Sequence, residues 1–349
     1  MASPDPPILV LNAGSSSLKL ALFDGLTQLR KATVEGLAPD GHRAALLALL
    51  ADGFGRGVTA TAHRVVHGGA RLTQAMRIDA AVLAEIEACL PLAPLHNPAN
   101  LAAIRALAEA MPDLPQFASF DTAFHASNPE VALRYALPAS AEAQGIRRYG
   151  FHGLSYAAIV RKLQETAGNV LPKRLLALHL GNGASLCAIL NGQSVATTMG
   201  YSPLDGLTMG TRSGGIDGNA VLRMAELYGI DGASRILNRE SGLLGLGGSN
   251  DMRALHAAGT PEARFAIAHF CYWAVRHAGS MVAAMAGLDG VAFTGGIGEN
   301  AVQVRRTILQ GLDFIAAGKP VWVIEAAEER QIAAEALALI MSDTSGPLG

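Results

Sequence analysis

A strand–turn–strand pattern occurs twice in the sequence, at nearly half-chain spacing. The first copy reads LVLNAGSSSLKLALFD over Leu9–Asp24, and the second reads LALHLGNGASLCAILNG over Leu176–Gly192. In each copy an apolar run ends in a polar turn that contains glycine, and a second apolar run follows. The repetition predicts two similar domains, each with one such hairpin. The alternative is two unrelated hairpins that share a generic pattern.

Strand-like and helix-like segments alternate along the whole chain. Apolar runs that end in polar glycine turns predict strands at Ile8–Leu11, Leu175–Leu180 and Val291–Thr294. Amphipathic spacing predicts helices at His42–Ala51, Ala99–Ala110, Leu154–Glu165, Asn219–Leu227, Pro261–Ala286 and Glu328–Leu339. This alternation predicts layered α/β structure rather than an all-β or all-helical fold. At about 150 residues per domain, 349 residues correspond to about two domains.

The composition excludes several classes of protein. Half of the residues are hydrophobic and 16% are charged, so the chain can bury a large core and is not disordered as a whole. The 27 basic and 29 acidic residues give a net charge of −2. A near-neutral chain lacks the basic field of a general nucleic-acid binder, so we expect no nucleic-acid partner. Cys89, Cys187 and Cys271 are too few and too scattered for a disulfide framework or a zinc site.

Neither a membrane segment nor a targeting signal is evident. The most apolar helical stretch, Phe265–Leu288, contains His269, Arg276 and His277, and its uncharged part is too short to cross a bilayer. The first residues, MASPDPP, lack the basic and apolar regions of a secretory signal. We therefore expect a cytoplasmic protein without a membrane partner.

Three glycine-rich turns follow predicted strands. They are Asn12–Lys19 (NAGSSSLK), His179–Gly183 (HLGNG) and Thr294–Asn300 (TGGIGEN). Closely spaced backbone amides, hydroxyls and one lysine are the donors that a polyphosphate requires. The Walker A pattern is absent, so this is not a P-loop protein. Three such turns together indicate a nucleotide site, although each alone is also compatible with an ordinary polar turn.

Two arginines, one aspartate and one histidine stand in short glycine-rich or aromatic motifs. Arg64 lies in HRVVHGG, Arg212 in GTRSGG, Asp121 in FDTAFH and His152 in GFHG. Taken singly, each arginine is more typical of a surface salt bridge, and the aspartate is equally compatible with a helix N-cap and the histidine with a cap or a core position. Together they favour phosphoryl transfer over hydrolysis, because the GxSxG and HExxH motifs of hydrolases are absent.

Eight motifs occur in one order between residues 9 and 300: VLNAGSSSLK, HRVVHGG, APLHNP, FDTAFH, GFHG, HLGNG, MGTRSG and GGIGEN. In this order they closely resemble the acetokinase family of the actin/Hsp70/sugar-kinase superfamily. The resemblance implies an α/β fold with two duplicated actin/Hsp70-like (ribonuclease H-like) domains around a central cleft. The N-terminal domain would comprise residues 1–124 and about 330–349, and the C-terminal, nucleotide-binding domain residues 125–329. It also implies a homodimer.

The resemblance assigns expected roles to individual residues. Arg64, Asp121, His152 and Arg212 would be catalytic, and Arg64 would also bind the substrate carboxylate. An apolar pocket for the substrate methyl group would consist of Val66, Leu95, Phe151 and Pro203. Asn12 and Glu328 would hold Mg²⁺, with Mn²⁺ as a substitute, although the surroundings of Glu328 diverge. ATP or ADP would contact Lys19, His179, Leu180, Gly181, Asn182, Gly183, Asp251, Met252, Arg253, Gly296, Ile297, Gly298, Glu299 and Asn300.

The implied reaction is the reversible, Mg²⁺-dependent transfer of a phosphoryl group from ATP to acetate, which yields acetyl phosphate and ADP. Its chemistry suits these residue types. A carboxylate with a pKa of about 4–5 is already ionised at pH 7 and needs no general base. Asp121 is therefore better suited to orienting Mg²⁺ or an arginine than to removing a proton. The alternatives are a propionate kinase, another short-chain carboxylate kinase, or a non-catalytic nucleotide-dependent switch.

The sequence departs from the family pattern at two positions after the TRSG motif. Gly215 stands where an Asp is usual, and Gly218 where a Pro is usual. The chain is also shorter than typical members, with the deficits before His63 and between Phe314 and Val321. These segments are expected to be trimmed surface regions, because the motifs on both sides remain.

Overall fold

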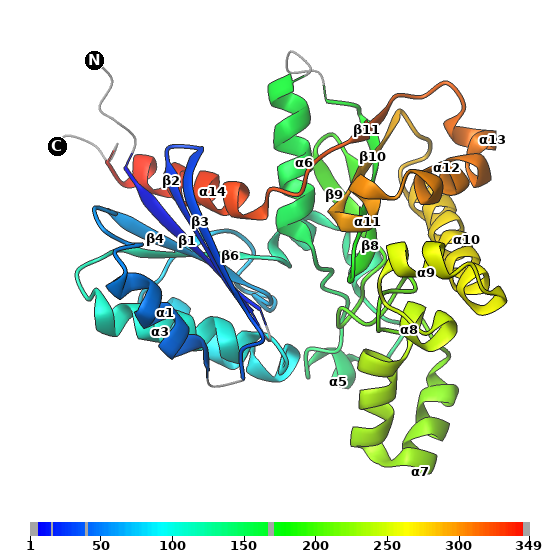
Figure 1. The fold of residues 1–349 in the computed structure, drawn as a ribbon, viewed down its shortest axis with the longest axis horizontal. Helices are drawn as coiled ribbons and strands as arrows, with labels where there is room; N and C mark the ends of the chain where they lie inside the picture. Colours follow the sequence, from blue (N-terminus) through cyan, green and yellow to red (C-terminus); the bar gives the residue numbers. More distant parts are fainter. Residues whose placement is uncertain (1–5, 15–16, 39–40, 167–170, 345–349) are drawn as a thin grey trace. The chain divides into compact units, whose positions relative to one another are not determined.

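The computed structural model describes residues 6–14, 17–38, 41–166 and 171–344. The chain divides into two compact units (Figure 1). Unit 1 comprises Met1–Ala126 and Ala327–Gly349, and unit 2 comprises Ser127–Ala326. The C-terminal segment thus returns to the N-terminal unit.

Unit 1 contains a six-stranded sheet with the order β3-β2-β1-β4-β6-β5. Its strands are β1 (Ile8–Ala13), β2 (Ser17–Asp24), β3 (Thr27–Glu35), β4 (Ala60–Val65), β5 (Met76–Arg77) and β6 (Gln116–Phe120). The first three strands form an antiparallel meander. The strands β1, β4 and β6 run parallel to one another, and β5 pairs antiparallel at the edge. Three neighbouring strands therefore end at the same edge of the sheet.

Helices cover both faces of this sheet. The helices of unit 1 are α1 (Gly41–Ala51), α2 (Ala80–Ala88), α3 (Asn97–Ala110) and α14 (Glu328–Thr344), with a 3₁₀ turn at Leu90–Leu92. Figure 1 shows α1 and α3 on one face and α14 on the other. The core beneath α1 and α3 joins the sheet residues Leu9 and Leu20 to Leu46 and Leu107. Coverage on both faces explains why every residue of β1 is buried.

Unit 2 contains a five-stranded sheet with the order β11-β10-β7-β8-β9. Its strands are β7 (Arg174–Leu180), β8 (Ala184–Leu190), β9 (Gln193–Thr197), β10 (Gly290–Thr294) and β11 (Val321–Val323). The strands β7, β8 and β9 are antiparallel, whereas β10 and β11 run parallel to β7. In Figure 1, α6 (Gly153–Thr166) and α10 (Pro261–Ala284) lie on opposite sides of this sheet.

The two sheets confirm the predicted duplication. In each, an antiparallel three-stranded meander is extended from its first strand by two parallel strands, so β3-β2-β1-β4-β6 corresponds to β9-β8-β7-β10-β11. The repeated sequence pattern forms the β1–β2 hairpin in unit 1 and the β7–β8 hairpin in unit 2. This is the ribonuclease H-like arrangement expected from the sequence.

In its described residues, unit 2 contains eight further α-helices. They are α4 (Glu130–Leu133), α5 (Ala139–Glu142), α7 (Gly218–Arg235), α8 (Gly242–Gly247), α9 (Met252–Ala258), α11 (Gly295–Asn300), α12 (Val302–Gly311) and α13 (Asp313–Ala316). The helix α7 is broken at Gly229, which has φ 70° and ψ 167°. Left-handed backbone is readily available only to glycine, which explains why the amphipathic pattern ends at Leu227. Each of the six predicted helices overlaps an observed one.

The three cysteines are unpaired and buried. Within the described ranges, no helix is long and apolar enough to span a bilayer.

His63 on β4 gives unit 1 a pH-dependent stability. The side chain is 1% exposed, and its Nε2 lies 2.8 Å from Gln116 Oε1 on β6. Burial lowers the pKa of His63 to about 4, although the hydrogen bond with Gln116 opposes this shift. Between about pH 6.5 and 4 the unfolded chain therefore binds a proton that the folded chain rejects, so folding weakens as pH falls through this window.

We expect acidification from pH 8 to pH 5 to lower the free energy of unfolding by about 2 kcal/mol through His63 alone. Urea titrations at both pH values measure this cost, and His63→Gln should reduce the difference by about that amount. His256→Gln, at an exposed position on α9, is the control. An equal pH dependence in His63→Gln and in the unmodified protein would contradict the assignment.

Candidate functional site

Three parallel strands of unit 1 bring Asn12, Arg64 and Asp121 together. Asn12 lies near the end of β1, and Arg64 near the end of β4; Asp121 directly follows β6. The register pairs Leu11 with His63 and Arg64 with Ser119, so the three residues occupy one edge of the sheet. In α/β sheets the carboxyl ends of parallel strands are the usual location of ligands.

Arg64 is held by Asp121 and Asn12. Its Nη2 lies 2.5 Å from Asp121 Oδ2, and its Nε donates to Asp121 Oδ1 and Oδ2 at 3.2 and 3.1 Å. Its Nη1 donates to Asn12 Oδ1 at 3.1 Å. The side chains of Arg64 and Asp121 are 18% and 1% exposed, so this is a buried pair and not a surface salt bridge. These contacts use three of the five N–H groups, and two further donors can meet a ligand.

Two glutamates at the start of α14 complete this cluster. Glu328 Oε2 lies 3.8 Å from Arg64 Nε, and Glu329 Oε1 accepts a hydrogen bond from Asn12 Nδ2 at 3.2 Å. The family resemblance predicts a role for Glu328 but none for Glu329. Its position beside Glu328 was the available signal.

The charges of the cluster control its pKa values. Burial alone would lower the pKa of Arg64, but the charges of Asp121 and Glu328 outweigh it, and the net shift is upward. Burial raises the pKa of Asp121 to about 6, against the opposing effect of Arg64. At neutral pH both side chains are charged, so the pair presents a permanent guanidinium in a fixed orientation.

Oxygen ligands in this cluster suit Mg²⁺. Among the residues that the structure describes, no three His, Cys, Asp or Glu side chains are grouped so as to hold a metal alone. Magnesium usually takes one or two carboxylates and completes its shell with water and substrate phosphates. The Asn12 amide oxygen and the Glu328 carboxylate provide such a partial set.

His152 and Arg212 meet at Gly183 in unit 2. An added Cβ at Gly183, in the β7–β8 turn, would lie 3.1 Å from His152 Nε2 and 3.6 Å from Arg212 Nη1. His152 adopts φ 58°, in the left-handed region that non-glycine residues rarely enter. Such backbone strain concentrates at functional sites, where the surrounding structure maintains it.

The ring of His152 is held on two sides. It stacks on His179 with ring centroids 4.1 Å apart, and its Nδ1 lies 2.9 Å from Ser185 Oγ. His179 Nδ1 lies 2.8 Å from Ser155 Oγ. Each ring therefore has its Nδ1 beside a serine hydroxyl, and His152 Nε2 lies on the side of Gly183.

Arg212 is a cation without a compensating carboxylate. Its Nη1 donates to the Pro203 carbonyl at 2.9 Å. Burial lowers the pKa of Arg212, and within the described part of the chain no acidic group opposes this shift. The surface salt bridge that the sequence also allowed is therefore wrong. A desolvated, uncompensated guanidinium favours the binding of an anion.

A cavity of about 1060 Å³ adjoins the β7–β8 turn in unit 2. Such a volume accommodates a ligand the size of a nucleotide. Eight of the predicted nucleotide-binding residues line it: Gly181, Asn182, Asp251, Met252, Arg253, Gly296, Ile297 and Asn300. Five further lining residues had not been predicted, namely Asn250, His256, Ala301, Val302 and Gln303.

The other predicted nucleotide-binding residues of unit 2 lie outside this lining. They are His179, Leu180, Gly183, Gly298 and Glu299. The Glu299 carboxylate accepts hydrogen bonds from the backbone amides of Gly295 and Ala326 at 3.0 and 2.9 Å. Gly295 has φ 79°, and a Cβ there would lie 2.7 Å from the Leu180 carbonyl, so glycine is required where the chain passes this close. Glu299 thus stabilises the start of the glycine-rich helix α11.

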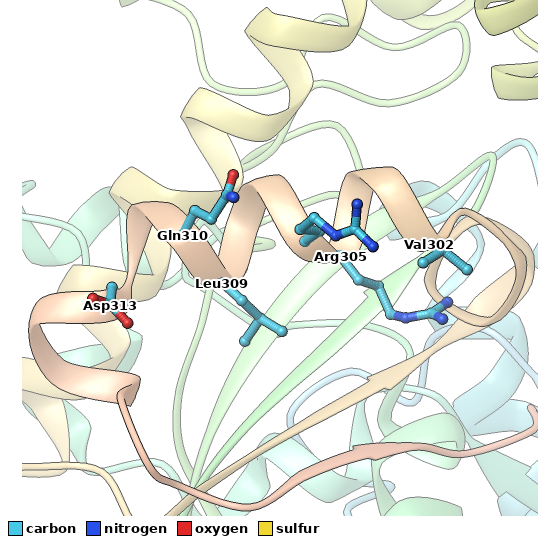
Figure 2. Close-up of a pocket in the computed structure, with 6 residues that line it drawn as sticks. Val302, Arg305, Leu309, Gln310 and Asp313 are labelled. Carbon is cyan, nitrogen blue, oxygen red and sulfur yellow. The ribbon is translucent and has the colours of Figure 1, made fainter.

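A second hollow, of about 570 Å³, lies beside α12 (Figure 2). Its lining consists of Val302, Arg305, Arg306, Leu309, Gln310 and Asp313. Arg305 Nη1 donates to the carbonyls of Gly298 and Glu299 at 2.8 and 2.7 Å. The arginine therefore stabilises the C-terminal half of the glycine-rich helix α11 through these two hydrogen bonds.

Comparison with known proteins identifies the family. The profile of the Acetokinase family matches residues 54–331. The chain belongs to this family. The acetate kinase of Pseudomonas aeruginosa strain LESB58 is 44% identical, over 97% of this chain and 100% of that protein. The acetate kinase of Rhodopseudomonas palustris strain CGA009 is 43% identical, over 87% of this chain and 85% of that protein.

Solved structures of the acetokinase fold agree. The Porphyromonas gingivalis acetate kinase superposes with a TM-score of 0.86 at 33% identity, covering 96% of this chain and all of that one. A propionate kinase from Francisella tularensis superposes with a TM-score of 0.86 at 34% identity, and the match covers 95% of this chain and 98% of that one. The ROK hexokinase from Thermus thermophilus superposes with a TM-score of 0.51 at 17% identity, and the match covers 97% of this chain and 100% of that one. The similarity of fold therefore extends to a sugar kinase.

The residues proposed for an acetokinase methyl pocket belong to both units. Val66 and Leu95 lie in unit 1, where Val66 is buried and Leu95 is 47% exposed. Phe151 and Pro203 lie in unit 2, buried and half-buried respectively. Lys19 is half-buried on β2, and Ser15 and Ser16 of its turn lie outside the described residues. A shared pocket of these residues stays a prediction.

The two departures from the acetokinase pattern lie on either side of the N-cap of α7: Gly215 precedes the helix and donates its N–H to the Gly206 carbonyl at 2.9 Å, and Gly218 lies within it. Gly218 is the first residue of this helix, the position at which proline is best tolerated. Asp217 caps the helix, since its carboxylate accepts a hydrogen bond from the Asn219 backbone amide at 2.9 Å. The cap maintains the start of the helix, and the glycine removes the rigidity that a proline provides.

Proposed function

We propose that the chain is an acetate kinase, a phosphotransferase with a carboxyl group as acceptor, which transfers a phosphoryl group reversibly between ATP and acetate. The buried Arg64–Asp121 pair carries this proposal, because it offers a fixed guanidinium with donors to spare. The acetate kinases that are 43–44% identical support the same activity.

The acetate carboxylate is the nucleophile of the proposed reaction. One carboxylate oxygen forms a bond to the γ-phosphorus of ATP while the bond to the bridging oxygen breaks, and that electron pair leaves with ADP. The products are acetyl phosphate and ADP, and no proton is transferred. Since both reactants are anions, catalysis consists of positioning and charge compensation.

Each unit supplies part of that compensation. Arg64 binds the carboxylate, and Asp121 acts as a positioning residue that keeps the guanidinium oriented. His152 Nε2 and Arg212, which meet at Gly183, stabilise the charge on the transferring phosphoryl group. The nucleotide occupies the cavity beside the β7–β8 turn, with its phosphates towards Gly183. This proposal requires that the two clusters act on one phosphorus atom.

Asn12 and Glu328 are the residues that would hold Mg²⁺, and Mn²⁺ is an acceptable substitute. When bound, the ion neutralises negative charge on the nucleotide phosphates. We also propose a cytoplasmic location and a homodimeric assembly, as the family resemblance implies. The unpaired cysteines are in keeping with a reducing compartment.

Val66 is expected to set the preference for acetate over longer acids. One methylene is worth about 1–3 kcal/mol of discrimination in an apolar pocket. Val66→Ala should therefore raise the ratio of kcat/KM for propionate to that for acetate by about tenfold. Val65→Ala, a truncation in the core of the same unit, is the matched control. A ratio that is unchanged in Val66→Ala would remove Val66 from the pocket.

Trapping of the acyl phosphate with hydroxylamine tests the function directly. With ATP, Mg²⁺ and acetate, the protein should form acetyl hydroxamate and ADP in equal amounts. A much higher kcat/KM for propionate or butyrate would reassign the substrate. Nucleotide binding without any acyl phosphate would instead favour a nucleotide-dependent switch.

A further inference from the structure

A buried asparagine at the start of α3 links the ends of two strands of unit 1. Asn100 lies in the first turn of α3 and is 1% exposed. Its Nδ2 donates to the Ala13 carbonyl at 2.7 Å, and its Oδ1 accepts from the Val66 backbone N–H at 3.1 Å. A carbonyl only accepts and a backbone N–H only donates, so the direction of both bonds and the orientation of the amide are fixed. Because Ala13 is also paired with Leu18 of β2, the bridge holds the β1–β2 turn against the end of β4.

This bridge lies directly beyond the last backbone pair between β1 and β4. The described register of these strands ends at the Leu11–His63 pair. Asn12 and Arg64 come next along the two strands, so they lie between that pair and the bridge made by Asn100. Their side chains are in contact there, since Arg64 Nη1 donates to Asn12 Oδ1 at 3.1 Å. Asn100 therefore continues the connection between the strands on the far side of the two site residues.

The spacing between Arg64 and Asp121 has a different origin. The Asp121 backbone N–H donates to the Val65 carbonyl at 3.1 Å, so the backbone bonds between β4 and β6 reach Asp121 itself. Loss of the bridge at Asn100 would therefore leave the Arg64–Asp121 pair in place and release Asn12. The two spacings can be separated by experiment.

We propose that Asn100 is a positioning residue that sets the distance between the Asn12 amide and the Arg64 guanidinium by holding the ends of β1 and β4 together. Its consequence for catalysis rests on the proposed function, in which Arg64 binds the acetate carboxylate and Asn12 is one of the residues that would hold Mg²⁺. A displacement of about 1 Å among such groups can lower a rate by about a hundredfold.

Asn97 offers a matched control in the same turn of α3. It is 0% exposed, its Nδ2 donates to the His67 carbonyl at 3.0 Å, and its Oδ1 accepts from the His67 backbone N–H at 3.1 Å. Both of these bonds go to one residue, so they do not connect β4 to β1. Asn97→Asp and Asn100→Asp each keep the shape of the side chain and replace a buried donor by an oxygen that faces a carbonyl. The two variants therefore differ in the link between strands and not in the kind of group removed.

Crystal structures of the two variants without ligands test the positioning role independently of activity. In Asn100→Asp we expect the separation of Arg64 Nη1 and Asn12 Oδ1 to increase from 3.1 Å to more than about 3.5 Å, while Arg64 keeps its bonds to Asp121. In Asn97→Asp both contacts of Arg64 should be unchanged. An unchanged Arg64–Asn12 contact in Asn100→Asp would overturn the proposal.

Steady-state kinetics tests the effect on the reaction. Asn100→Asp should lower kcat/KM for acetate by about 10–100-fold, as do losses of other groups that orient a ligand-binding side chain. The KM for ATP should stay within about threefold, because the nucleotide cavity is lined by residues of unit 2. Asn97→Asp should keep kcat/KM for acetate within about threefold of the unmodified value even where it lowers thermal stability. An equal loss in both variants would show that Asn100 acts only through stability and would contradict the proposal.

Asn100→Ala decides the question if Asn100→Asp does not fold, because it removes both bonds and adds no charge. The same longer Arg64–Asn12 separation and the same loss for acetate are expected. Unmodified values of both quantities in Asn100→Ala would contradict the assignment. Absence of acetyl phosphate with the unmodified protein would refute the proposed function, and the crystal structures would still test the position of Asn12.

Discussion

Replacement of Arg64 by alanine is expected to lower kcat/KM for acetate by about a thousandfold or more. The guanidinium is the group proposed to bind the substrate carboxylate, and the Asp121 and Asn12 contacts fix its orientation. Arg64→Lys should lose nearly as much, because an ammonium group cannot bond Asp121 and a carboxylate with the same planar geometry. Steady-state formation of acetyl hydroxamate at varied acetate concentrations measures the effect.

The same substitution should also weaken the fold. It leaves the 1%-exposed Asp121 carboxylate without its counter-charge, which typically costs about 3–5 kcal/mol. The double variant Arg64→Ala/Asp121→Asn is therefore the control, since it removes both charges. We expect it to regain most of the lost thermal stability but none of the activity. Recovery of activity in the double variant would show that Arg64 acts only through stability.

Replacement of Arg212 by alanine should have an equally large effect on kcat, with the opposite consequence for stability. An arginine that stabilises a transferring phosphoryl group contributes about 10³–10⁵ in kcat, so we expect a loss in that range. Because no carboxylate in the described chain compensates Arg212, its removal relieves a desolvation cost. The unfolding free energy should then stay equal or increase.

Urea unfolding and steady-state kinetics on the same preparation test this pair of effects. Arg235→Ala is the control, since Arg235 forms an exposed ion pair with Glu240, and it should leave both quantities unchanged. A loss of stability in Arg212→Ala as large as that in Arg64→Ala would indicate a structural role. Wild-type kcat in Arg212→Ala would exclude it from the reaction.

Much of the fold was predictable because its signals are local. Apolar runs and the glycine turns between them predicted the β1–β2 and β7–β8 hairpins, and amphipathic spacing predicted α3, α6 and α10. The individual roles of Arg64 and Arg212 were not decided locally. Only tertiary structure separates a buried Arg64–Asp121 pair from a surface salt bridge, because Arg64 lies on β4 and Asp121 directly follows the adjacent parallel strand β6, with 56 residues between them.

The residues that sequence reasoning missed depend on three-dimensional packing. Glu329 reaches Asn12 only because α14 returns to unit 1 from the C-terminal end of the chain. Ser185 is an ordinary residue of an apolar strand, and only the folded chain places its hydroxyl beside the His152 ring. Asn250 lies in a loop and His256 on the short helix α9, and neither carries a periodic signal, so a cavity was needed to find them.

A crystal structure with Mg²⁺, ADP, aluminium fluoride and acetate provides the most direct measurement. Aluminium fluoride imitates the phosphoryl group in flight between the two oxygens. We predict the acetate carboxylate within about 3 Å of the Arg64 guanidinium, and the fluoride ligands within the same distance of His152 Nε2 and Arg212. Acetate bound away from Arg64, or an aluminium fluoride group that contacts neither His152 nor Arg212, would contradict a single reaction centre built from both units.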